Sequence, residues 1–447
     1  MSQPRSATST TFPLDRGVIR RFLEEQKLDL RTASIREINR LVGTIERDQG
    51  VRFIRMEFGI PGLPAHPVAI EAEIRALREQ DVAHVYAPFD GVSALKEEAA
   101  RFVERFMGVV VPPSCCIPTI GTMEGCFASL AVAGRLTRSR RTVLFLDPGF
   151  PVNRLQARFL GLGVRSLDFY DHRGPRLVDA VDSLAAGGDI CAILWSSPNN
   201  PTWIALDESE LLGLGRVCDR HGIVAIEDLA YFGMDVRRGV PRPGTPPYQP
   251  TVLRSTKHAI SLISASKMFS YAGQRIGIAV LSPDLAAMEA EELVEFFGTR
   301  SVGHAFSHGV LYPIAACVPQ APQYGLLALL RAANAGDESV FAPAAEYARR
   351  AAIMKRKFLE NGFRLVYDND LGRPLADGFY FTVCHPAYAS GVELLRELLR
   401  YGISAITLET TGSCRKEGLR ACASLVGDDL FDELGERLRR FAEEQSS

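Results

Sequence analysis

The side chain that the sequence sets apart for chemistry is Lys267, which follows an apolar run at residues 259–263. This run predicts a short buried strand, and Ser264 and Ser266 place two hydroxyls directly before the lysine. A lysine amine whose pKa is lowered by burial and by its neighbours can form a Schiff base with a carbonyl group. The pattern therefore indicates a lysine that captures a carbonyl compound. An ordinary strand and loop with a solvated lysine fits this stretch alone equally well.

Arg275 lies in the same stretch, between Gly273 and Gly277. Its planar guanidinium could bind a phosphate through two parallel hydrogen bonds. The hydroxyls of Ser264 and Ser266 could bind the same anion. The alternative is a salt-bridged arginine, and the rest of the chain has to decide between the two.

A second place for an anion is predicted where an apolar run at residues 116–120 passes through Gly121, Thr122 and Met123. A helix is expected next, over residues 126–136. A strand that runs through glycine into a helix start leaves backbone N–H groups free to bind an anion.

Two further predicted strands end in distinctive side chains. The run at residues 142–146 is followed by Phe150, which is equally suited to be a core residue or a flat platform for a ring. The run at residues 190–195 is followed by Asn200, which neighbouring prolines hold on a stiff turn.

A carboxylate closes the next apolar run, residues 223–226, where Asp228 is followed by the phenol of Tyr231. Burying both groups costs free energy unless each is hydrogen-bonded. For one such aspartate in isolation, the default interpretation is a helix N-cap.

These residues need a common scaffold to meet. Between Cys116 and Val280, short apolar runs alternate with helical patterns, which predicts a largely parallel α/β sheet. Turns that end such strands meet at the carboxyl edge of the sheet, where open α/β sheets bind ligands. Pyridoxal phosphate needs all of the groups gathered there: N–H groups and an arginine for its phosphate, an aromatic face, a carboxylate for its ring nitrogen, donors for its phenolic oxygen, and a lysine.

The composition is that of an ordinary globular protein, with 47% hydrophobic and 23% charged residues, and 447 residues suggest two domains. A net charge of −2 gives no electrostatic case for nucleic acid or a membrane surface, and no apolar run approaches a membrane span of about 20 residues. Nine scattered cysteines, of which only Cys115 and Cys116 are close, predict reduced cytosolic thiols and no metal site. The polar start, Met1 to Thr11, is expected to be disordered and is no secretion signal.

Taken together, the motifs resemble the class I/II aminotransferase family, whose members are fold-type I pyridoxal-phosphate enzymes. The resemblance covers most of the chain, and its specificity lies in the order and spacing of Ser264-x-Ser266-Lys267, Gly273-x-Arg275-x-Gly277, Pro198-Asn199-Asn200-Pro201-Thr202 and Asp228-x-x-Tyr231. It implies an α/β fold with a mostly parallel seven-stranded sheet sandwiched by helices and a smaller α+β domain. The implied domains are an N-terminal arm with part of the small domain (1–65), a large cofactor-binding domain (66–334) and a C-terminal small domain (335–447).

Carried over by position, the resemblance implies that Lys267 binds the cofactor aldehyde and later moves the proton at the substrate Cα. It also implies that Asp228 pairs with the pyridine nitrogen, that Asn200 and Tyr231 bond the phenolic oxygen, and that Phe150 stacks on the ring. The implied phosphate contacts are the backbone at Thr122 and Met123, the side chains of Ser264 and Ser266, and Arg275.

Tyr86, in Tyr-x-Pro-x-x-Gly, is similar to the family's tyrosine that reaches the phosphate of the neighbouring subunit, which implies a homodimer with shared active sites. Arg420 is the expected partner of the substrate carboxylate, with Arg415 as the alternative. Gly59 matches the family's loop that closes over the substrate.

Two positions depart from the family pattern. Trp203 stands where the run Asn-Pro-Thr usually continues with glycine, so either the turn takes a different shape or the indole lines something. Arg300 lies in a segment that relatives pass across the dimer interface. It could bind a distal substrate carboxylate, but an interface salt bridge is the favoured interpretation.

The resemblance implies an aminotransferase, a transferase expected in a biosynthetic process in the cytoplasm, that moves the amino group of an α-amino acid to a 2-oxo acid by a ping-pong mechanism. β-Eliminating lyases and biosynthetic cyclases share the fold, and the cofactor-binding residues do not separate these reactions. Some relatives are transcription regulators, but no DNA-binding segment precedes the domain here and Lys267 is intact. The expected partners are small molecules, and neither nucleic acid nor a membrane is expected.

Overall fold

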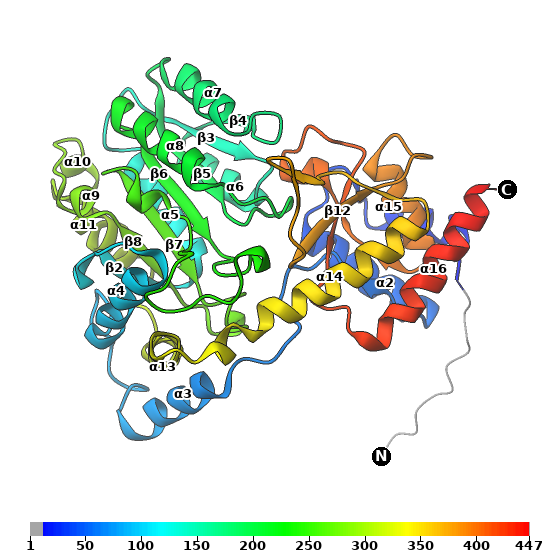
Figure 1. The fold of residues 1–447 in the computed structure, drawn as a ribbon, viewed down its shortest axis with the longest axis horizontal. Coiled ribbons are helices and arrows are strands. Elements are labelled where there is room, and N and C mark those ends of the chain that lie inside the picture. The colour runs from blue at the N-terminus through cyan, green and yellow to red at the C-terminus, as the bar shows by residue number, and fades with distance from the viewer. Residues whose placement is uncertain (1–11, 447) are drawn as a thin grey trace.

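A computed structural model describes residues 12–446, so the expected disordered start, Met1 to Thr11, lies outside the described residues. The chain forms two bodies that lie side by side (Figure 1), and the larger is built on one seven-stranded sheet. Its strand order is β2-β8-β7-β6-β5-β3-β4. The strands are β2 (Cys116–Thr119), β3 (Thr142–Asp147), β4 (Gly163–Asp168), β5 (Ile190–Ser196), β6 (Val224–Leu229), β7 (Ala259–Ser264) and β8 (Gly277–Leu281).

Strand direction makes one edge of this sheet suitable for a site. The neighbouring pairs from β7 through β6, β5 and β3 to β4 are all parallel, whereas β8 is antiparallel to both β7 and β2. The start of β8 therefore lies at the same edge as the ends of the other six strands. The expected mostly parallel, seven-stranded α/β sheet is confirmed.

Both faces of the sheet are covered by helices (Figure 1). Strand residues alternate between the two faces, so that Leu144 and Ile193 belong to one core cluster and Val143 and Ala192 to the other. The helices of this body are α3 (Pro67–Glu79), α4 (Ser93–Met107), α5 (Gly121–Ala133), α6 (Pro151–Phe159), α7 (Pro175–Ala185), α8 (Glu208–His221), α9 (Pro283–Ala287), α10 (Leu293–Phe297), α11 (Val302–His304), α12 (Tyr312–Ala315), α13 (Gln320–Ala335) and the π-helix η5 (Ala305–Leu311).

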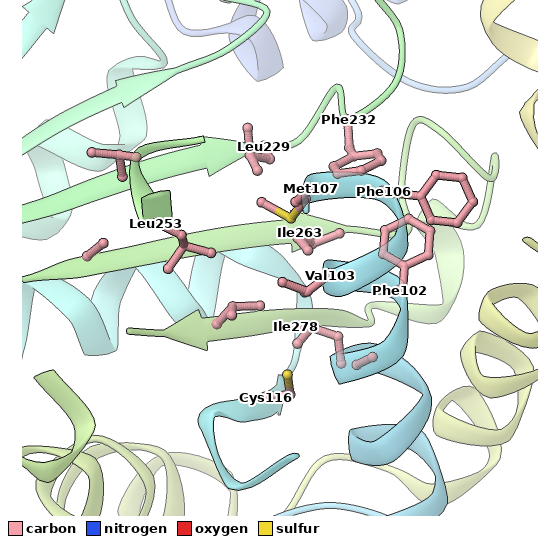
Figure 2. Close-up of a cluster of buried hydrophobic side chains, with 14 of the residues drawn as sticks. Phe102, Val103, Phe106, Met107, Cys116, Leu229, Phe232, Leu253, Ile263 and Ile278 are labelled. Carbon is pink, nitrogen blue, oxygen red and sulfur yellow. The ribbon is translucent and has the colours of Figure 1, made fainter. Parts of the chain in front are cut away.

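Helix α4 supplies much of the core under the strands that carry the site. Figure 2 shows Phe102 and Phe106 of α4 beside Phe232, with Ile263 of β7 and Ile278 of β8 next to them. Full burial of aromatic and aliphatic side chains of this size stabilises the fold by about 1.5–3 kcal/mol each. The packing holds β7 in place, and with it the backbone that leads to Lys267.

The smaller body combines the two ends of the described chain, because α1 and α2 pack with C-terminal elements around one core (Figure 1). Its sheet has the order β14-β15-β12-β9, and two short pairs, β1 with β13 and β10 with β11, flank it. The predicted domain boundaries at 65/66 and 334/335 stay predictions. The elements are α1 (Arg16–Glu25), α2 (Ile35–Gln49), α14 (Ala342–Glu360), α15 (Gly391–Arg400), α16 (Asp428–Ser446), β1 (Ile54–Arg55), β9 (Arg364–Leu365), β10 (Asn369–Asp370), β11 (Arg373–Pro374), β12 (Tyr380–Cys384), β13 (Ile403–Ser404), β14 (Ile406–Thr407) and β15 (Leu419–Cys422).

Some predicted element bounds were wrong. Helix α5 begins at Gly121 instead of residue 126, because Gly121 has a φ of +69° that turns the chain from β2 directly into the helix. Strand β6 continues to Leu229, so Asp228 lies inside the strand and is no helix N-cap. Within residues 12–446, no helix is long and apolar enough to cross a membrane.

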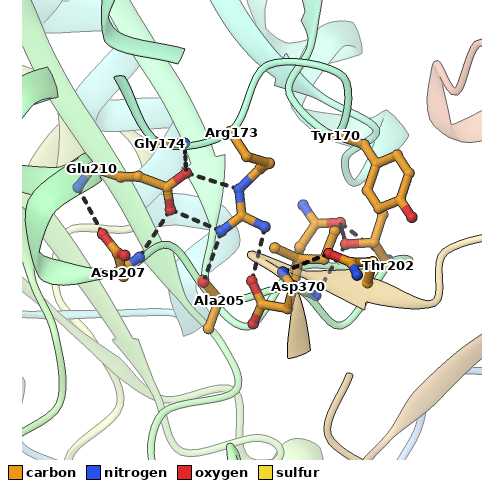
Figure 3. Close-up of polar contacts among 12 residues, drawn as sticks. Tyr170, Arg173, Gly174, Thr202, Ala205, Asp207, Glu210 and Asp370 are labelled. Carbon is orange, nitrogen blue, oxygen red and sulfur yellow. Dashed lines mark hydrogen bonds and ion pairs between the residues drawn. The ribbon is translucent and has the colours of Figure 1, made fainter. Parts of the chain in front are cut away.

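A buried ion-pair network joins the two bodies (Figure 3). Arg173 donates to both Glu210 oxygens, at 2.8 Å each, and to Asp370 at 2.8 Å. Asp370 belongs to the β10–β11 hairpin and also accepts from Arg237 at 2.7 Å. Since each charge has an opposite partner, the network can be buried between the bodies without an uncompensated ion.

Candidate active site

The predicted cofactor residues gather at the edge of the large sheet where the parallel strands end. Each comes from a segment that directly follows or closes a strand, except Arg275, which directly precedes the reversed strand β8. The residues are Thr122 and Met123 after β2, Phe150 after β3, Asn200 after β5, Asp228 and Tyr231 at and after β6, Ser264, Ser266 and Lys267 at and after β7, and Arg275 before β8.

Lys267 is half-buried, and its Nζ donates a 2.5 Å hydrogen bond to the carbonyl oxygen of Gly59. The pKa of the Lys267 amine is lowered to about 8, chiefly by burial; Cys422 opposes this shift, and the positive charges of Arg275 and Arg420 add to it. With this pKa, about a tenth of the amine is neutral at pH 7, against far less for an ordinary lysine. The amine is therefore suited to attack a carbonyl carbon at neutral pH.

An anion cradle forms where α5 meets Arg275. The N-cap residue, Ile120, offers no side-chain cap, so the N–H groups of Thr122 and Met123 lie in an uncapped first turn. Arg275 itself has a left-handed φ of +52°. This conformation lays its guanidinium against Gly121, where a Cβ would lie 2.5 Å from Nη2. The helix N-terminus and the guanidinium both favour an anion at this position.

Ser264 and Ser266 bring two hydroxyls to the same sheet edge, where Ser264 lies opposite Gly277 of β8. Ser264 Oγ accepts a 3.1 Å hydrogen bond from the Ser266 N–H, and both serines are buried. Glu124 accepts from the Ile120 N–H at 2.6 Å, and burial raises the pKa of this carboxyl. A raised pKa reduces the negative charge that Glu124 brings to the cradle.

Asp228 carries a buried carboxylate oxygen that lacks a partner. Its Oδ1 has no hydrogen bond within the described chain. Burial raises the pKa of Asp228 to about 7, while the Ala230 N–H acts in the opposite direction. Side chains on this face of β6 point toward α5, as those of Val224 and Ile226 do. An unpaired buried carboxylate costs free energy, so the site is built for a hydrogen-bond donor that the chain does not supply.

Asn200 and Tyr231 are tied to side chains from the smaller body. Asn200 Oδ1 accepts from Arg420 Nη1 at 3.3 Å. The Tyr231 hydroxyl donates to the Tyr380 hydroxyl at 2.9 Å, and burial raises the pKa of Tyr231 well above its usual value. The amide and the phenol therefore stay neutral and lie between the two bodies.

The two arginines considered for a substrate carboxylate lie in different surroundings. Arg420, on β15, is 1% exposed, its Nη2 donates to the Glu57 carbonyl oxygen, and its Nε has no partner within the described chain. Arg415 forms a 2.6 Å ion pair with Asp171 and a 3.6 Å contact with Asp168. Arg420 thus keeps donor capacity inside the site, whereas Arg415 is neutralised outside it.

The other predicted residues take different positions. Gly59 lies in the site, because its carbonyl oxygen receives the Lys267 hydrogen bond. Phe150 is half-buried at the N-cap of α6. Tyr86 is 79% exposed on the loop between α3 and α4 and faces solvent in the single chain.

Trp203 keeps the left-handed backbone that a glycine would adopt, with a φ of +64°, and its indole lines the site. The ring centroid lies 5.2 Å from that of Tyr231 and 6.2 Å from that of Tyr380. Gly378 faces it without a side chain, since a Cβ there would lie 2.1 Å from the indole. Arg300 is exposed and pairs with Glu291 of the same chain at 2.5 Å, so its salt bridge lies within one chain, and a role at a dimer interface stays a prediction.

Sequence reasoning missed Phe379, Tyr380 and Cys422 as site residues. The ring centroid of Phe379 lies 5.5 Å from Lys267 Nζ, and the Cys422 thiol is close enough to influence the Lys267 pKa. The run 378–383 signalled a strand, but only the pairing of β12 with β15 places its first residues against Lys267. In residues 12–446, no group of three His, Cys, Asp or Glu side chains is arranged to hold a metal ion.

Comparison with known proteins identifies a family and a fold. Residues 56–438 match the family model described as aminotransferase class I and II. The chain is 30% identical over 245 residues to an LL-diaminopimelate aminotransferase of Oleidesulfovibrio alaskensis, covering 54% of this chain and 60% of that protein. It is 23% identical to a probable aspartate aminotransferase of Methanocaldococcus jannaschii, covering 86% and 92%.

Among solved structures, the aspartate aminotransferase of Thermus thermophilus with maleate has a TM-score of 0.72 at 21% identity, covering 95% of this chain and 98% of that one. The aspartate aminotransferase of Thermotoga maritima has a TM-score of 0.73 at 17% identity, covering 95% and 99%. At these identities the likeness concerns the fold.

Proposed function

The chain belongs to the class I and II aminotransferases, and from this premise we propose that it transfers the amino group of an α-amino acid to a 2-oxo acid by a ping-pong mechanism. The observation that carries the proposal is the pair of groups at one sheet edge: the Lys267 amine, with a pKa of about 8, and the Asp228 carboxylate, whose buried Oδ1 has no hydrogen-bond partner within the described chain. Family members of this fold depend on pyridoxal phosphate.

The residues present fit this cofactor. The orphaned Asp228 Oδ1 matches a ring N–H, and the cradle of Gly121 and Arg275 matches a phosphate. When bound, pyridoxal phosphate supplies an aldehyde for covalent attachment and a protonated ring that withdraws electron density from the substrate Cα. We assign the phosphate to the backbone at Thr122 and Met123, to Ser264 and Ser266, and to Arg275.

The remaining cofactor contacts follow from position. Asp228 would hold the ring nitrogen and keep it protonated. Asn200 and Tyr231 donate hydrogen bonds to the phenolic oxygen. Phe150 covers one face of the ring. Lys267 would hold the cofactor aldehyde, and its neutral Nζ would accept the proton that leaves the substrate Cα.

Arg420 binds the substrate carboxylate in this proposal, because its guanidinium is buried and has an unused donor, Nε. Gly59 belongs to the segment that covers the substrate. Tyr86 reaches the phosphate of a second copy, which requires a homodimer with shared sites. A cytoplasmic location and a role in a biosynthetic process stay predictions.

The test uses the purified protein with pyridoxal phosphate and single amino acids. Stoichiometric conversion of the cofactor to its amine form, reversed by a 2-oxo acid, is the expected result. Continuous release of ammonia and a 2-oxo acid without such conversion would instead assign the site to β-elimination. A panel of amino acids measured in this way also identifies the donor.

A further inference from the structure

Tyr380 lies between Tyr231, which the proposed function assigns to the cofactor, and Arg420, which it assigns to the substrate carboxylate. It is the first residue of β12 and is 2% exposed. Its hydroxyl accepts from Tyr231 at 2.9 Å, and the Arg420 guanidinium lies 4.5 Å from its ring centroid. Its hydroxyl also lies against Gly59, where a Cβ would be 1.8 Å from the oxygen.

Sheet pairing fixes this position. In the antiparallel pair of β12 with β15, Tyr380 lies opposite Cys422, and Thr382 lies opposite Arg420. Residues two apart on a strand point to the same face, so Tyr380 and Arg420 both point into the site. The distance between the two side chains is therefore set by the pairing of the strands and not by a loop.

The indole of Trp203 packs against the rings of both Tyr231 and Tyr380. A bulky residue in the left-handed region is rare, and such backbone strain costs about 1–3 kcal/mol and persists where the surroundings hold it. Here the indole makes edge contacts with the rings of Tyr231 and Tyr380 and fills the space over Gly378. The indole therefore packs against both phenol rings.

The two phenols have two protons and share one hydrogen bond. Burial raises the pKa of Tyr231 well above its usual value and that of Tyr380 to about 12, so both stay protonated at neutral pH. If Tyr380 turns its proton toward Tyr231, the Tyr231 proton becomes free for a third oxygen. Hydrogen bonds in such a chain strengthen each other.

We propose that Tyr380 is a positioning residue that directs the Tyr231 hydroxyl toward the cofactor's phenolic oxygen and holds the Arg420 guanidinium for the substrate carboxylate. The inference rests on the proposed function. The hydroxyl serves the first task and the ring serves the second. The two tasks are therefore separable by substitution.

The test of the hydroxyl is a spectroscopic pH titration of the pyridoxal-phosphate-loaded protein. Tyr380→Phe should raise the midpoint pH of the visible absorption change, with a roughly twofold to tenfold change in the proton dissociation constant, as expected for loss of one hydrogen bond. Tyr380→Phe should add no further change to Tyr231→Phe, because the hydroxyl acts through Tyr231. Tyr401→Phe is the matched control, since Tyr401 is buried in the smaller body and bonds Glu444.

The test of the ring is binding of 2-aminoisobutyrate, an amino acid without a Cα proton. Tyr380→Phe should leave its Kd within about twofold, whereas Tyr380→Leu should raise it roughly threefold to thirtyfold through loss of the cation–π contact. An unchanged midpoint in Tyr380→Phe, or equal Kd values in Tyr380→Phe and Tyr380→Leu, would overturn the inference while leaving the proposed function intact. A native protein without visible absorption after addition of the cofactor would overturn both.

Discussion

The guanidinium of Arg275 covers the α-carbon of Gly121, so that a side-chain carbon at position 121 would lie 2.5 Å from Arg275 Nη2. The two residues are far apart in the sequence, because Gly121 follows β2, the first strand of the large sheet, and Arg275 precedes β8, its last strand. They meet because β8 pairs with β2, with Gly277 opposite Thr119. The antiparallel strand thus delivers the arginine to the helix N-terminus and completes the anion cradle.

Gly121→Ala should therefore weaken binding of pyridoxal phosphate by about tenfold or more, because the methyl group displaces a charge-assisted donor. Isothermal titration of the cofactor-free protein measures the effect. Gly188→Ala is the matched control, since Gly188 has a φ of +75° but no atom within 4 Å of its Cβ position. Equal affinities in the two variants would show that the cradle does not hold the phosphate.

Asp228 gives a prediction with a definite pH sign. The pKa of its carboxyl is raised from 3.8 to about 7 in the folded chain, so the folded state retains a proton that the unfolded state loses. The free energy of unfolding of the cofactor-free protein should then fall as the pH rises from about 4 to 7. Asp228→Asn should remove this fall and also weaken cofactor binding.

Urea unfolding at pH 4.5 and pH 7.5 checks this prediction. Asp228→Asn should be about as stable as the native chain at the lower pH and about 1–3 kcal/mol more stable at the higher one. If the difference in unfolding free energy between the native chain and Asp228→Asn is the same at both pH values, the interpretation of Asp228 as an unpaired buried carboxylate is wrong.

Arg420 and Arg415 are distinguished by steady-state kinetics. Arg420→Leu should raise KM for the amino acid about 30-fold or more, because a buried charged donor for the carboxylate is lost. Arg415→Leu should leave KM nearly unchanged, since its guanidinium is paired with Asp171. A large KM effect confined to Arg415→Leu would move the substrate carboxylate to the other arginine.

The ion-pair network between the two bodies gives a stability prediction. Asp370→Asn removes a buried carboxylate that accepts from Arg173 and Arg237. Each arginine keeps a second acidic partner, so the expected loss of unfolding free energy is about 1–3 kcal/mol, below the 3–5 kcal/mol for breaking an isolated buried pair. Glu291→Gln, in the exposed pair with Arg300, should leave the urea midpoint unchanged.

The sequence predicted those parts of the site that depend on strand order. Lys267, Asp228 and Asn200 each follow an apolar run, and the carboxyl ends of parallel strands meet wherever the helices lie. Tyr380 and Cys422 could not be predicted in this way. Their place depends on how the small sheet of the second body is paired and how that body lies against the first, which no local pattern encodes.

The choice between arginines shows the same limit. Arg415 and Arg420 are five residues apart, and the sequence offers no sign that Asp168 and Asp171 would neutralise one of them. Trp203 was recognised as a departure, but its partner Gly378 was not. Their complementarity appears only when two distant segments are packed together.

The site of covalent attachment shows whether Lys267 captures the cofactor carbonyl. Native protein is loaded with pyridoxal phosphate near pH 8, where half of the Lys267 amine is neutral, reduced with borohydride and digested for mass spectrometry. We expect the reduced cofactor on Lys267, and neither label nor activity in Lys267→Ala. A label on another lysine, or full turnover by Lys267→Ala, would contradict it.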